Sequence, residues 1–396
     1  MDATYKRRLE KNIGKYSWYK VFTKRVYLPL ITIQLVNVGR VTISQLAAIA
    51  AASSIISIVL QVPAGYMADK WGNKRAIIFG TAVLSISPLF YILSPNFIGG
   101  MTASLLFFGG TSFTMGAVEA FMHDTLVELG KADLYAKVLG RAQSYGLIGN
   151  IILITAIPAT YAINHALPFI LGFISLVILL AITTSFAYPE DHSTNVHQKN
   201  PFAATKNIIT KQNIVIFLFA GFMAGVSNRG GEYNTLLFQT VGIHVVWYGA
   251  IAALGSVAGA IMGRYLQILD TLKPVSLYLF DLLFLTGCLI FVGVNSNPAF
   301  SILGFTLFMG YGRVRLILVQ SKLLSEIKHV YKATLLSALN LFSNVGEILA
   351  IFVLARLVNI QGLVNGYLWF GLTSLAIGLV LWLLVARAYN TSEAQS

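Results

Sequence analysis

The stretch Gly65-Tyr-Met-Ala-Asp69-Lys70-Trp-Gly72-Asn-Lys74-Arg75 decides the fold class, because it is a short basic loop between two long apolar runs. The runs, Ile43–Ala68 and Ala76–Ser94, are each long enough to cross a bilayer, which takes roughly 20 apolar residues in a helix. We expect Gly72 to make the turn and Gly65 to allow neighbouring helices to approach closely. The cations of the loop would hold it at an anionic membrane surface.

The composition of the whole chain also indicates a membrane protein. Of its 396 residues, 56% are hydrophobic and 11% are charged, whereas an ordinary soluble domain has roughly 25% charged residues. One soluble core cannot hide so much apolar sequence, which excludes a soluble enzyme and a disordered chain. The net charge is +13, but Lys and Arg punctuate the apolar runs, so membrane lipids rather than nucleic acid are the expected partner. The single cysteine, Cys288, excludes an internal disulfide and a cysteine metal site, and no metal is expected.

Twelve apolar segments, six on each side of a polar stretch, predict an all-α integral membrane protein. We expect a six-helix bundle over residues 1–189, a cytoplasmic linker over 190–211 and a second bundle over 212–396. The expected spans are Tyr16–Asn37, Ile43–Ala68, Ala76–Ser94, Phe97–Leu126, Val138–Ile163, Leu167–Tyr188, Asn213–Gln239, Val246–Leu266, Val275–Val294, Pro298–Val319, Ala333–Val358 and Leu363–Ala386.

The distribution of basic residues predicts the orientation of this multi-pass protein. Most of the 28 Lys and Arg residues fall on the face that also holds both ends of the chain, and only Arg40 and Arg356 fall on the opposite face. The positive-inside rule therefore places the N- and C-termini in the cytoplasm. We expect a monomer in a bacterial inner membrane.

The loop Gly65–Arg75 resembles the G-x-x-x-D-[RK]-x-G-x-[RK]-[RK] signature of the major facilitator superfamily. Two further stretches resemble the same family, namely Glu119-Ala-Phe-Met-His123-Asp124 with the later Leu139-Gly140-Arg141, and Lys332-Ala-Thr334. The resemblance implies two pseudo-symmetric six-helix bundles and a cytoplasmic gate, with Asp124 expected to pair with Arg141. The gating residues that it implies are Gly65, Asp69, Lys70, Gly72, Lys74, Arg75, Asp124, Arg141, Lys332 and Thr334.

Charged residues inside the expected spans are the best candidates for a site, because each costs at least ~2.5–3.5 kcal/mol at the bilayer centre. All except Asp281 and Glu347 lie on the first, fourth, seventh and tenth spans, which line the central cavity in the fold that the resemblance implies. The set is Lys24, Arg25, Glu119, Arg229, Glu232, Asp281, Arg313, Arg315 and Glu347. The excess of cations on the cavity spans favours an anionic or zwitterionic substrate.

These charges and their polar neighbours divide into two expected roles. The substrate-binding candidates are Lys24, Arg25, Gln34, Asn37, Arg229, Tyr233 and Arg313. The proton-coupling candidates are Glu119, His123, Glu232 and Glu347, since buried carboxylates can titrate near neutrality. A salt bridge between helices is the alternative for each charge, and it is strongest for Asp281 and Arg315.

Helical spacing refines the expected site. Arg229 and Glu232 are i and i+3, so they can pair locally, and the glycines between them, Gly230 and Gly231, predict a bend or an unwound segment. Arg313 and Arg315 lie roughly 200° apart around a helix, so only one is expected to face the cavity.

Together these features predict a secondary active transporter that moves a small organic solute, amphiphilic ones included, by alternating access and proton coupling. It needs no cofactor besides the proton gradient. A multidrug or metabolite:proton exporter and a passive uniporter are the alternatives, although the fifth span lacks the Gly-Pro-x-x-Gly-Gly pattern frequent in proton-coupled drug exporters. An enzyme is disfavoured because the sequence has no HExxH, GxSxG or P-loop motif and no histidine cluster. A receptor is disfavoured because no extra soluble domain is seen.

Overall fold

The computed structural model describes residues 2–189, 211–325 and 332–393, and within these ranges every regular element is helical. Side chains are described for the same residues except 211–212, 323–337 and 391–393. The expected linker, 190–211, therefore lies outside the described residues apart from the backbone of residue 211, where a helix begins.

Contacts group the chain into two compact units. The first comprises Met1–Thr42, Ala52–Asn195 and Val245–Ala253, and the second comprises Ile43–Ala51, Val196–His244 and Leu254–Ser396. The expected halves, 1–189 and 212–396, follow the order of the chain, whereas these contacts assign Ile43–Ala51 to the second unit and Val245–Ala253 to the first.

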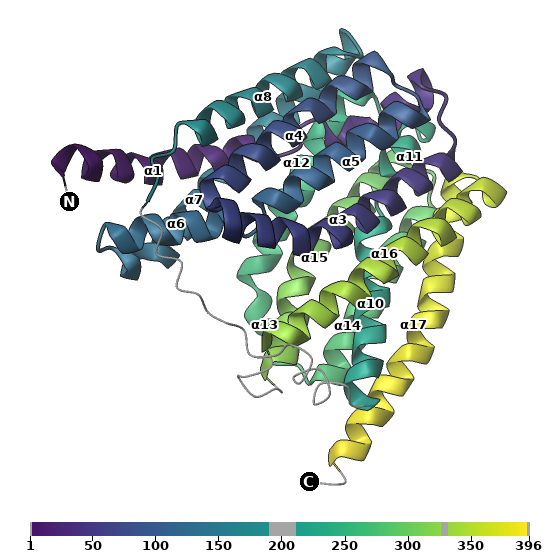
Figure 1. The fold of residues 1–396 in the computed structure, drawn as a ribbon. Coiled ribbons are helices and arrows are strands. Elements are labelled where there is room, and N and C mark those ends of the chain that lie inside the picture. The colour runs from purple at the N-terminus through teal and green to yellow at the C-terminus, as the bar shows by residue number, and fades with distance from the viewer. Residues whose placement is uncertain (1, 190–210, 326–331, 394–396) are drawn as a thin grey trace. The chain divides into compact units, whose positions relative to one another are not determined.

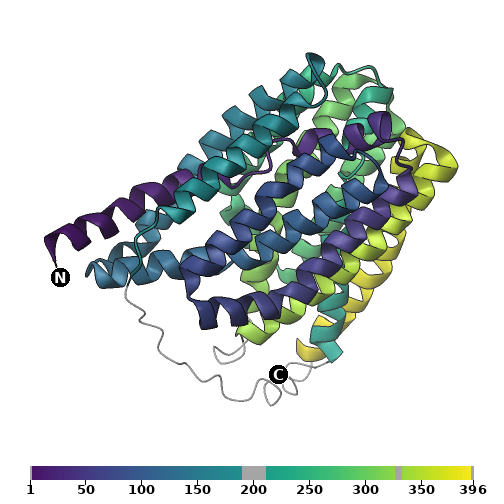
Figure 2. The same ribbon diagram turned by 45° about the horizontal axis from the view of Figure 1, so that its top comes forward.

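The helices before the linker begin and end close to the ends of the apolar runs of the sequence. Figure 1 shows how they are arranged. Helix α4 packs against both α5 and α8, and α1 packs along α7 and α8. The elements up to the linker are α1 (Ala3–Phe22), η1 (Leu28–Leu30), α2 (Ile31–Ile33), η2 (Gln34–Val38), α3 (Ile43–Trp71), α4 (Asn73–Leu93), α5 (Phe97–Thr114), α6 (Ala117–Glu128), η3 (Ala132–Leu134), α7 (Tyr135–Ala159), η4 (Thr160–Ala162) and α8 (Leu167–Thr184). In two views the N-terminal part of α1 projects past its neighbours (Figures 1 and 2).

The second unit is built around two closely packed helix pairs, α10 with α16 and α14 with α17. The elements after the linker are α10 (Lys211–Arg229), α11 (Asn234–Thr240), η5 (Val245–Trp247), α12 (Tyr248–Arg264), α13 (Leu266–Asp270), α14 (Pro274–Val294), α15 (Pro298–Ser325), α16 (Lys332–Gln361) and α17 (Leu363–Glu393).

Glycines set the closest helix contacts in both units. A Cβ at Gly80 of α4 would lie 2.6 Å from the Gly110 carbonyl oxygen of α5, and one at Gly225 of α10 would lie 2.2 Å from the Gly346 carbonyl oxygen of α16. Lipid tails are as apolar as the helices, so association in a bilayer depends on this kind of close van der Waals packing. Any side chain at these positions would force the helices apart.

The count of membrane spans falls short of the expected twelve. The described residues hold ten helices that are long and apolar enough to cross a membrane, or eleven when the bent pair Asn213–Arg229 and Asn234–Thr240 counts as one. The predicted break at Gly230 and Gly231 is confirmed, because α10 ends at Arg229 and α11 leaves it at 43°.

The expected first span, Tyr16–Asn37, is wrong as a continuous helix. Helix α1 ends at Phe22, and the chain resumes as a short 3₁₀ turn, one α-helical turn and a π-helix up to Val38. Two features of the sequence cause the break. Lys24 and Arg25 interrupt the apolar run, and Pro29 disfavours the α-helical conformation for the residue before it.

Candidate functional site

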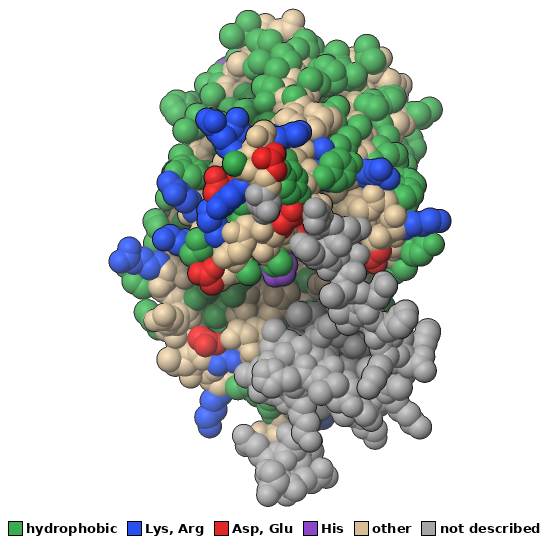
Figure 3. Space-filling model, turned by 60° about the vertical axis from the view of Figure 1, so that its left-hand side comes forward, with side chains coloured by type: hydrophobic (Ala, Val, Ile, Leu, Met, Phe, Trp, Pro, Cys, Tyr) green, Lys and Arg blue, Asp and Glu red, His purple; other side chains and the backbone are tan. Residues whose placement is uncertain are grey.

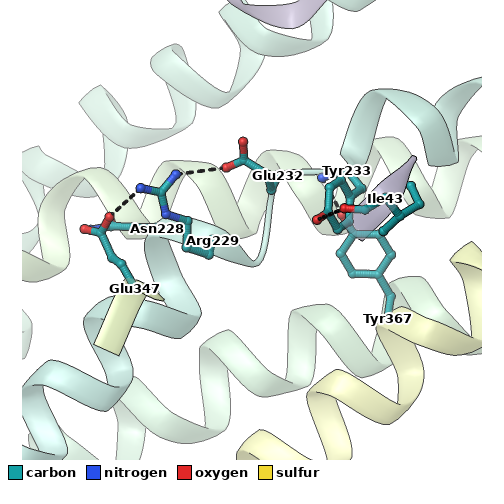
Figure 4. A network of polar contacts seen from close by, with 7 residues as sticks. All are labelled: Ile43, Asn228, Arg229, Glu232, Tyr233, Glu347 and Tyr367. Atoms are coloured by element: carbon teal, nitrogen blue, oxygen red, sulfur yellow. Dashed lines mark hydrogen bonds and ion pairs between the residues drawn. The ribbon is translucent and has the colours of Figure 1, made fainter. Parts of the chain in front are cut away.

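The most connected charged group within the spans is a network at the break between α10 and α11. Arg229, the last residue of α10, lies 2.8 Å from a Glu347 carboxylate oxygen and 3.2 Å from one of Glu232. Asn228 donates a further hydrogen bond of 2.7 Å to the other Glu347 oxygen (Figure 4). We call these four residues the Arg229 network. It holds one cation and two carboxylates, so its formal charge is −1 when all three groups are ionised.

The break in the helix creates the geometry of the Arg229 network. The chain leaves the α-helical path at Gly230, so the Glu232 side chain turns back beside the guanidinium that precedes it (Figure 4). Arg229 keeps 12% of its side-chain surface exposed, Glu347 keeps 16% and Glu232 keeps 30%. The local Arg229–Glu232 pair is confirmed, whereas the contact with Glu347, far along the chain in α16, has no signal in the sequence.

Tyr233, expected to bind substrate, is fully buried. Its hydroxyl donates to the Ile43 carbonyl oxygen at 3.3 Å, and its backbone N–H donates to the Tyr367 hydroxyl at 3.2 Å (Figure 4). The break after Arg229 turns the Tyr233 side chain toward α17 and the start of α3, within the second unit. Its contact with a substrate stays a prediction.

Gln34 is likewise a buried structural residue rather than an exposed ligand contact. Its amide nitrogen donates to the Tyr91 carbonyl oxygen at 2.9 Å, and its amide oxygen accepts from the Tyr161 hydroxyl at 3.1 Å. Both ends of the amide are therefore occupied in the core of the first unit. Asn37, one turn later, is exposed.

Arg25 lies in the break of the first span and is surrounded by aromatic rings. Its guanidinium donates to the Tyr91 hydroxyl at 2.7 Å and lies 4.2 Å from the ring centre of Phe107, with Phe108 and Tyr27 within 5.7 Å. The side chain is half-buried, as is the neighbouring Lys24. Cation–π contacts of this kind orient a guanidinium while leaving its charge intact.

Glu119 and His123, two proton-coupling candidates on α6, contact different partners. Glu119 pairs with Lys20 of α1, at 2.6 Å between Nζ and Oε1. The His123 imidazole lies 3.8 Å from Asp124 and packs edge-on against Tyr135. Lys20 was missed because its partner lies on a distant helix, and a single Lys near the edge of an apolar run gives no signal of its own.

The two arginines of α15 point different ways, as their spacing predicted. Arg315 is buried and binds Asp281 of α14 with both its Nε and its Nη2 atoms, the shortest of these contacts being 2.7 Å. Arg313 is exposed and packs beside Gly259 of α12, and it makes no ion pair with any described residue. Arg315 with Asp281 is therefore a structural pair, and Arg313 keeps its place among the substrate-binding candidates.

The structure describes only part of the expected cytoplasmic gate. Gly72 turns the chain with a φ of +85°, as predicted, whereas a Cβ at Gly65 would meet no described atom within 4 Å, so the expected close approach there is not made. Asp69 is exposed, and no described residue pairs with it. The side chains of Lys332 and Thr334 lie outside the described residues.

The expected pair of Asp124 with Arg141 is wrong. Asp124 accepts a hydrogen bond of 3.2 Å from Asn73 at the start of α4, and Arg141 lies over the ring of Tyr145, one turn along its own helix. Two basic side chains of the loop Gly65–Arg75 contact aromatic rings within the first unit. Lys70 lies near the Tyr66 ring and Lys74 lies 4.1 Å from the Tyr188 ring centre, and Arg75 is exposed.

Nothing in the described part of the chain resembles a metal centre. Across those residues, no three His, Cys, Asp or Glu side chains are grouped so that they could hold a metal ion. The chemistry that the charged groups offer is binding of an opposite charge and uptake or release of protons.

Comparison with known proteins identifies the architecture. The family model described as Major Facilitator Superfamily matches residues 21–351. The quinolone resistance protein NorA of Staphylococcus aureus is 23% identical over 313 residues, covering 73% of this chain and 74% of that protein.

Solved structures of transporters share the fold at low sequence identity. The nucleoside transporter NupG superposes with a TM-score of 0.77 at 14% identity, covering 96% of this chain and 99% of that one. The peptide transporter PepTSo gives 0.71 at 13% identity over 97% and 98% of the two chains. A bacterial homologue of the lysosomal transporter Spinster, in an inward-facing conformation, gives 0.70 at 12% identity over 98% and 97%.

Proposed function

This chain belongs to the major facilitator superfamily, and from that premise we propose that it is a proton-coupled secondary transporter of a small anionic or zwitterionic organic solute. Its two units would expose the solute alternately to the two sides of the membrane. We expect a monomer that needs no cofactor, in a bacterial inner membrane with both termini cytoplasmic.

The Arg229 network is the observation that carries proton coupling. One guanidinium faces two carboxylates, so a proton added to either Glu232 or Glu347 leaves a neutral pair on the other. The network holds one carboxylate more than it holds cations, so the gain of a single proton would make it formally neutral. The part-exposed Glu232 is the natural entry point, because it keeps more contact with the surroundings than Glu347 does. Glu119, already neutralised by Lys20, is the weaker proton-coupling candidate.

We assign substrate recognition first to Arg313 in the second unit, which makes no ion pair with any described residue. Arg25 in the first unit is the second candidate, because a hydroxyl and aromatic rings orient its guanidinium in the break of the first span. Arg229 and Arg315 are matched by carboxylates, so the charge available to an anion is smaller than the sequence alone suggested. Lys24 and Asn37 remain candidates beside Arg25.

Transport in proteoliposomes tests the proposal. A quinolone is the first compound to try, because the similarity to NorA favours drug export as the second candidate function. A pH gradient should drive accumulation by the wild type. Glu347→Gln and Glu232→Gln should each abolish that dependence while leaving substrate-induced thermal stabilisation in place. Glu128→Gln, at the end of α6, is the matched control and should transport normally.

Each outcome separates the candidates. Uptake that follows the substrate gradient but ignores the pH gradient in the wild type would identify a uniporter and remove the coupling assignment. Normal pH-driven transport by both Gln variants would remove the Arg229 network from the mechanism. Replacing Arg25 or Arg313 by Gln should weaken substrate binding, and an unchanged Kd in both variants would remove the anion assignment.

A further inference from the structure

Helix α1 carries a stripe of side chains that the proposed transport does not use. Arg8, Lys11 and Lys15 are spaced i, i+3 and i+7, and the same face continues through Trp18 to Phe22. Each cation directly precedes a buried residue, because Leu9, Asn12 and Tyr16 form the neighbouring stripe that packs into the first unit. The stripe therefore lies along the border of the packed face, cationic at its start and aromatic at its end.

The short segment that follows α8, residues 185–188, holds α1 in this position. The Asn12 side chain both donates to the Ala187 carbonyl and accepts from the Ala187 N–H, each at 3.0 Å. Tyr5 donates to the Tyr188 carbonyl oxygen at 2.8 Å, and Lys15 donates to the Ser185 carbonyl oxygen. These contacts hold α1 against the short segment that follows α8, and they fix the Lys15 side chain directly.

A fourth cation joins the stripe from another helix. Lys74, at the start of α4, lies over the Tyr188 ring at 4.1 Å. The electrostatic neighbours of Lys74 are Lys15 and Arg8, and no carboxylate is among them. We call Arg8, Lys11, Lys15 and Lys74 the α1–α4 cation cluster. Partial burial, then Lys11 and Arg8, lowers the pKa of Lys15, as expected where cations repel one another.

The α1–α4 cation cluster lacks the compensation found at other basic residues nearby. The carboxylate available on α1, Glu10, is bound by Lys131 at 3.1 Å, and none of the four cations has an acidic partner among the described residues. Many Lys and Arg side chains lie on the side of the molecule from which α1 projects, with Asp and Glu side chains among them (Figure 3). Four neighbouring cations, none of them paired with a described carboxylate, favour the binding of an anion between them.

The other end of the stripe indicates which anion fits. Trp18 is 59% exposed and stacks on Phe22, with ring centres 5.9 Å apart. Phe22 is partly buried against the core of the first unit and supports the exposed Trp18 ring. Cations followed along one face by an exposed aromatic ring match the order of groups in a phospholipid, from the charged headgroup to the interfacial glycerol and acyl chains. We propose that the α1–α4 cation cluster binds the headgroup of an anionic phospholipid, with the lipid's apolar part lying along Trp18 and Phe22. The binding site is independent of the substrate and of proton coupling.

Thermal unfolding of the full chain in detergent tests the proposal. Titration with phosphatidylglycerol should raise the Tm of the wild type, because a ligand that binds only the folded state stabilises it. Phosphatidylcholine and inorganic phosphate are the comparison ligands. A triple variant that carries Arg8→Gln, Lys11→Gln and Lys15→Gln should need a roughly 100-fold higher phosphatidylglycerol concentration for the same Tm shift, since each cation near an anionic surface contributes about fivefold.

Matched variants keep the result interpretable. A control variant combines Lys137→Gln, Arg264→Gln and Lys273→Gln, which also remove three positive charges but from exposed positions outside the cluster. It should respond to phosphatidylglycerol as the wild type does. Lys74→Gln alone, on a different helix, should weaken binding in the same direction. Trp18→Ala should weaken the response to phosphatidylglycerol and leave any response to inorganic phosphate as it was.

Three results would overturn the inference. The first is an equal Tm shift with phosphatidylcholine, which would show that charge does not matter. The second is an equal shift with inorganic phosphate, which would make the cluster a site for the free anion. The third is a wild-type response from the triple variant. Transport activity is measured separately, so loss of the lipid effect with normal transport, or the reverse, distinguishes failure of this inference from failure of the proposed function.

Discussion

The second unit contains two charged centres that look alike in the sequence and differ in the structure. Asp281 and Arg315 join two continuous helices, are 1% and 4% exposed, and balance each other as one anion with one cation. The Arg229 network lies at a broken helix, keeps up to 30% of a carboxylate exposed, and sets two anions against one cation. The buried pair is already neutral as a unit, whereas the Arg229 network is partly exposed and carries one carboxylate in excess. This excess charge is why we propose a functional role for the network and a structural one for the pair.

The largest expected effect is on stability, at the balanced pair. Asp281→Asn should lower the free energy of unfolding by about 3–5 kcal/mol, because it leaves the Arg315 guanidinium buried without a counter-ion. Thermal unfolding and recovery of folded protein from detergent measure the loss. Asp281→Leu combined with Arg315→Met should recover most of it, since apolar replacement of both partners removes the unpaired charge. A stable Asp281→Asn variant with impaired transport would mean that this pair is functional after all.

The next largest expected effect is on the stability of the Arg229 network. Either Glu232→Gln or Glu347→Gln alone should cost about 1 kcal/mol, because Arg229 keeps one carboxylate. The two together should cost about 3 kcal/mol, more than the sum of the single changes, because the guanidinium then loses both. A double-mutant cycle in thermal or denaturant unfolding measures the coupling. Strict additivity would show that the two carboxylates do not share the cation.

A smaller effect is expected at the ion pair of the first unit. Lys20→Met should cost about 1 kcal/mol, because Glu119 is 38% exposed and water partly replaces the lost partner. Transport by Glu119→Gln should keep its dependence on the pH gradient, in contrast to Glu347→Gln. A Glu119→Gln variant that loses this dependence would shift proton coupling to the first unit.

The smallest effect tests the residue beside the Arg229 network. Tyr233→Phe removes only the hydroxyl that donates to the Ile43 carbonyl oxygen, at a cost of about 0.5–1 kcal/mol. The substrate Kd should stay unchanged, because the hydroxyl points into the second unit rather than toward a ligand. A Kd raised tenfold with unchanged stability would restore Tyr233 as a substrate-binding residue.

Local patterns in the sequence predicted the parts of the site that depend on neighbours along the chain. The pair of Arg229 with Glu232, the break at Gly230 and the divergence of Arg313 from Arg315 all follow from helical geometry and glycine flexibility. Partners far apart in the chain were not predictable, as Glu347 for Arg229 and Lys20 for Glu119 show. The pairing of Asp124 with Arg141 was predicted incorrectly for the same reason, because in the structure Asp124 accepts a hydrogen bond from Asn73 instead.

The sequence by itself determined that this protein is a bundle of membrane-spanning helices of the major facilitator superfamily, because apolar length, short basic loops and a turn glycine are local properties. Only the tertiary structure decided which charges neutralise one another. That outcome depends on which helices lie side by side and on where a span breaks. The break near Lys24, Arg25 and Pro29 divides the expected first span into two segments. The break at Gly230 lets Arg229 pair with two carboxylates, Glu232 and Glu347.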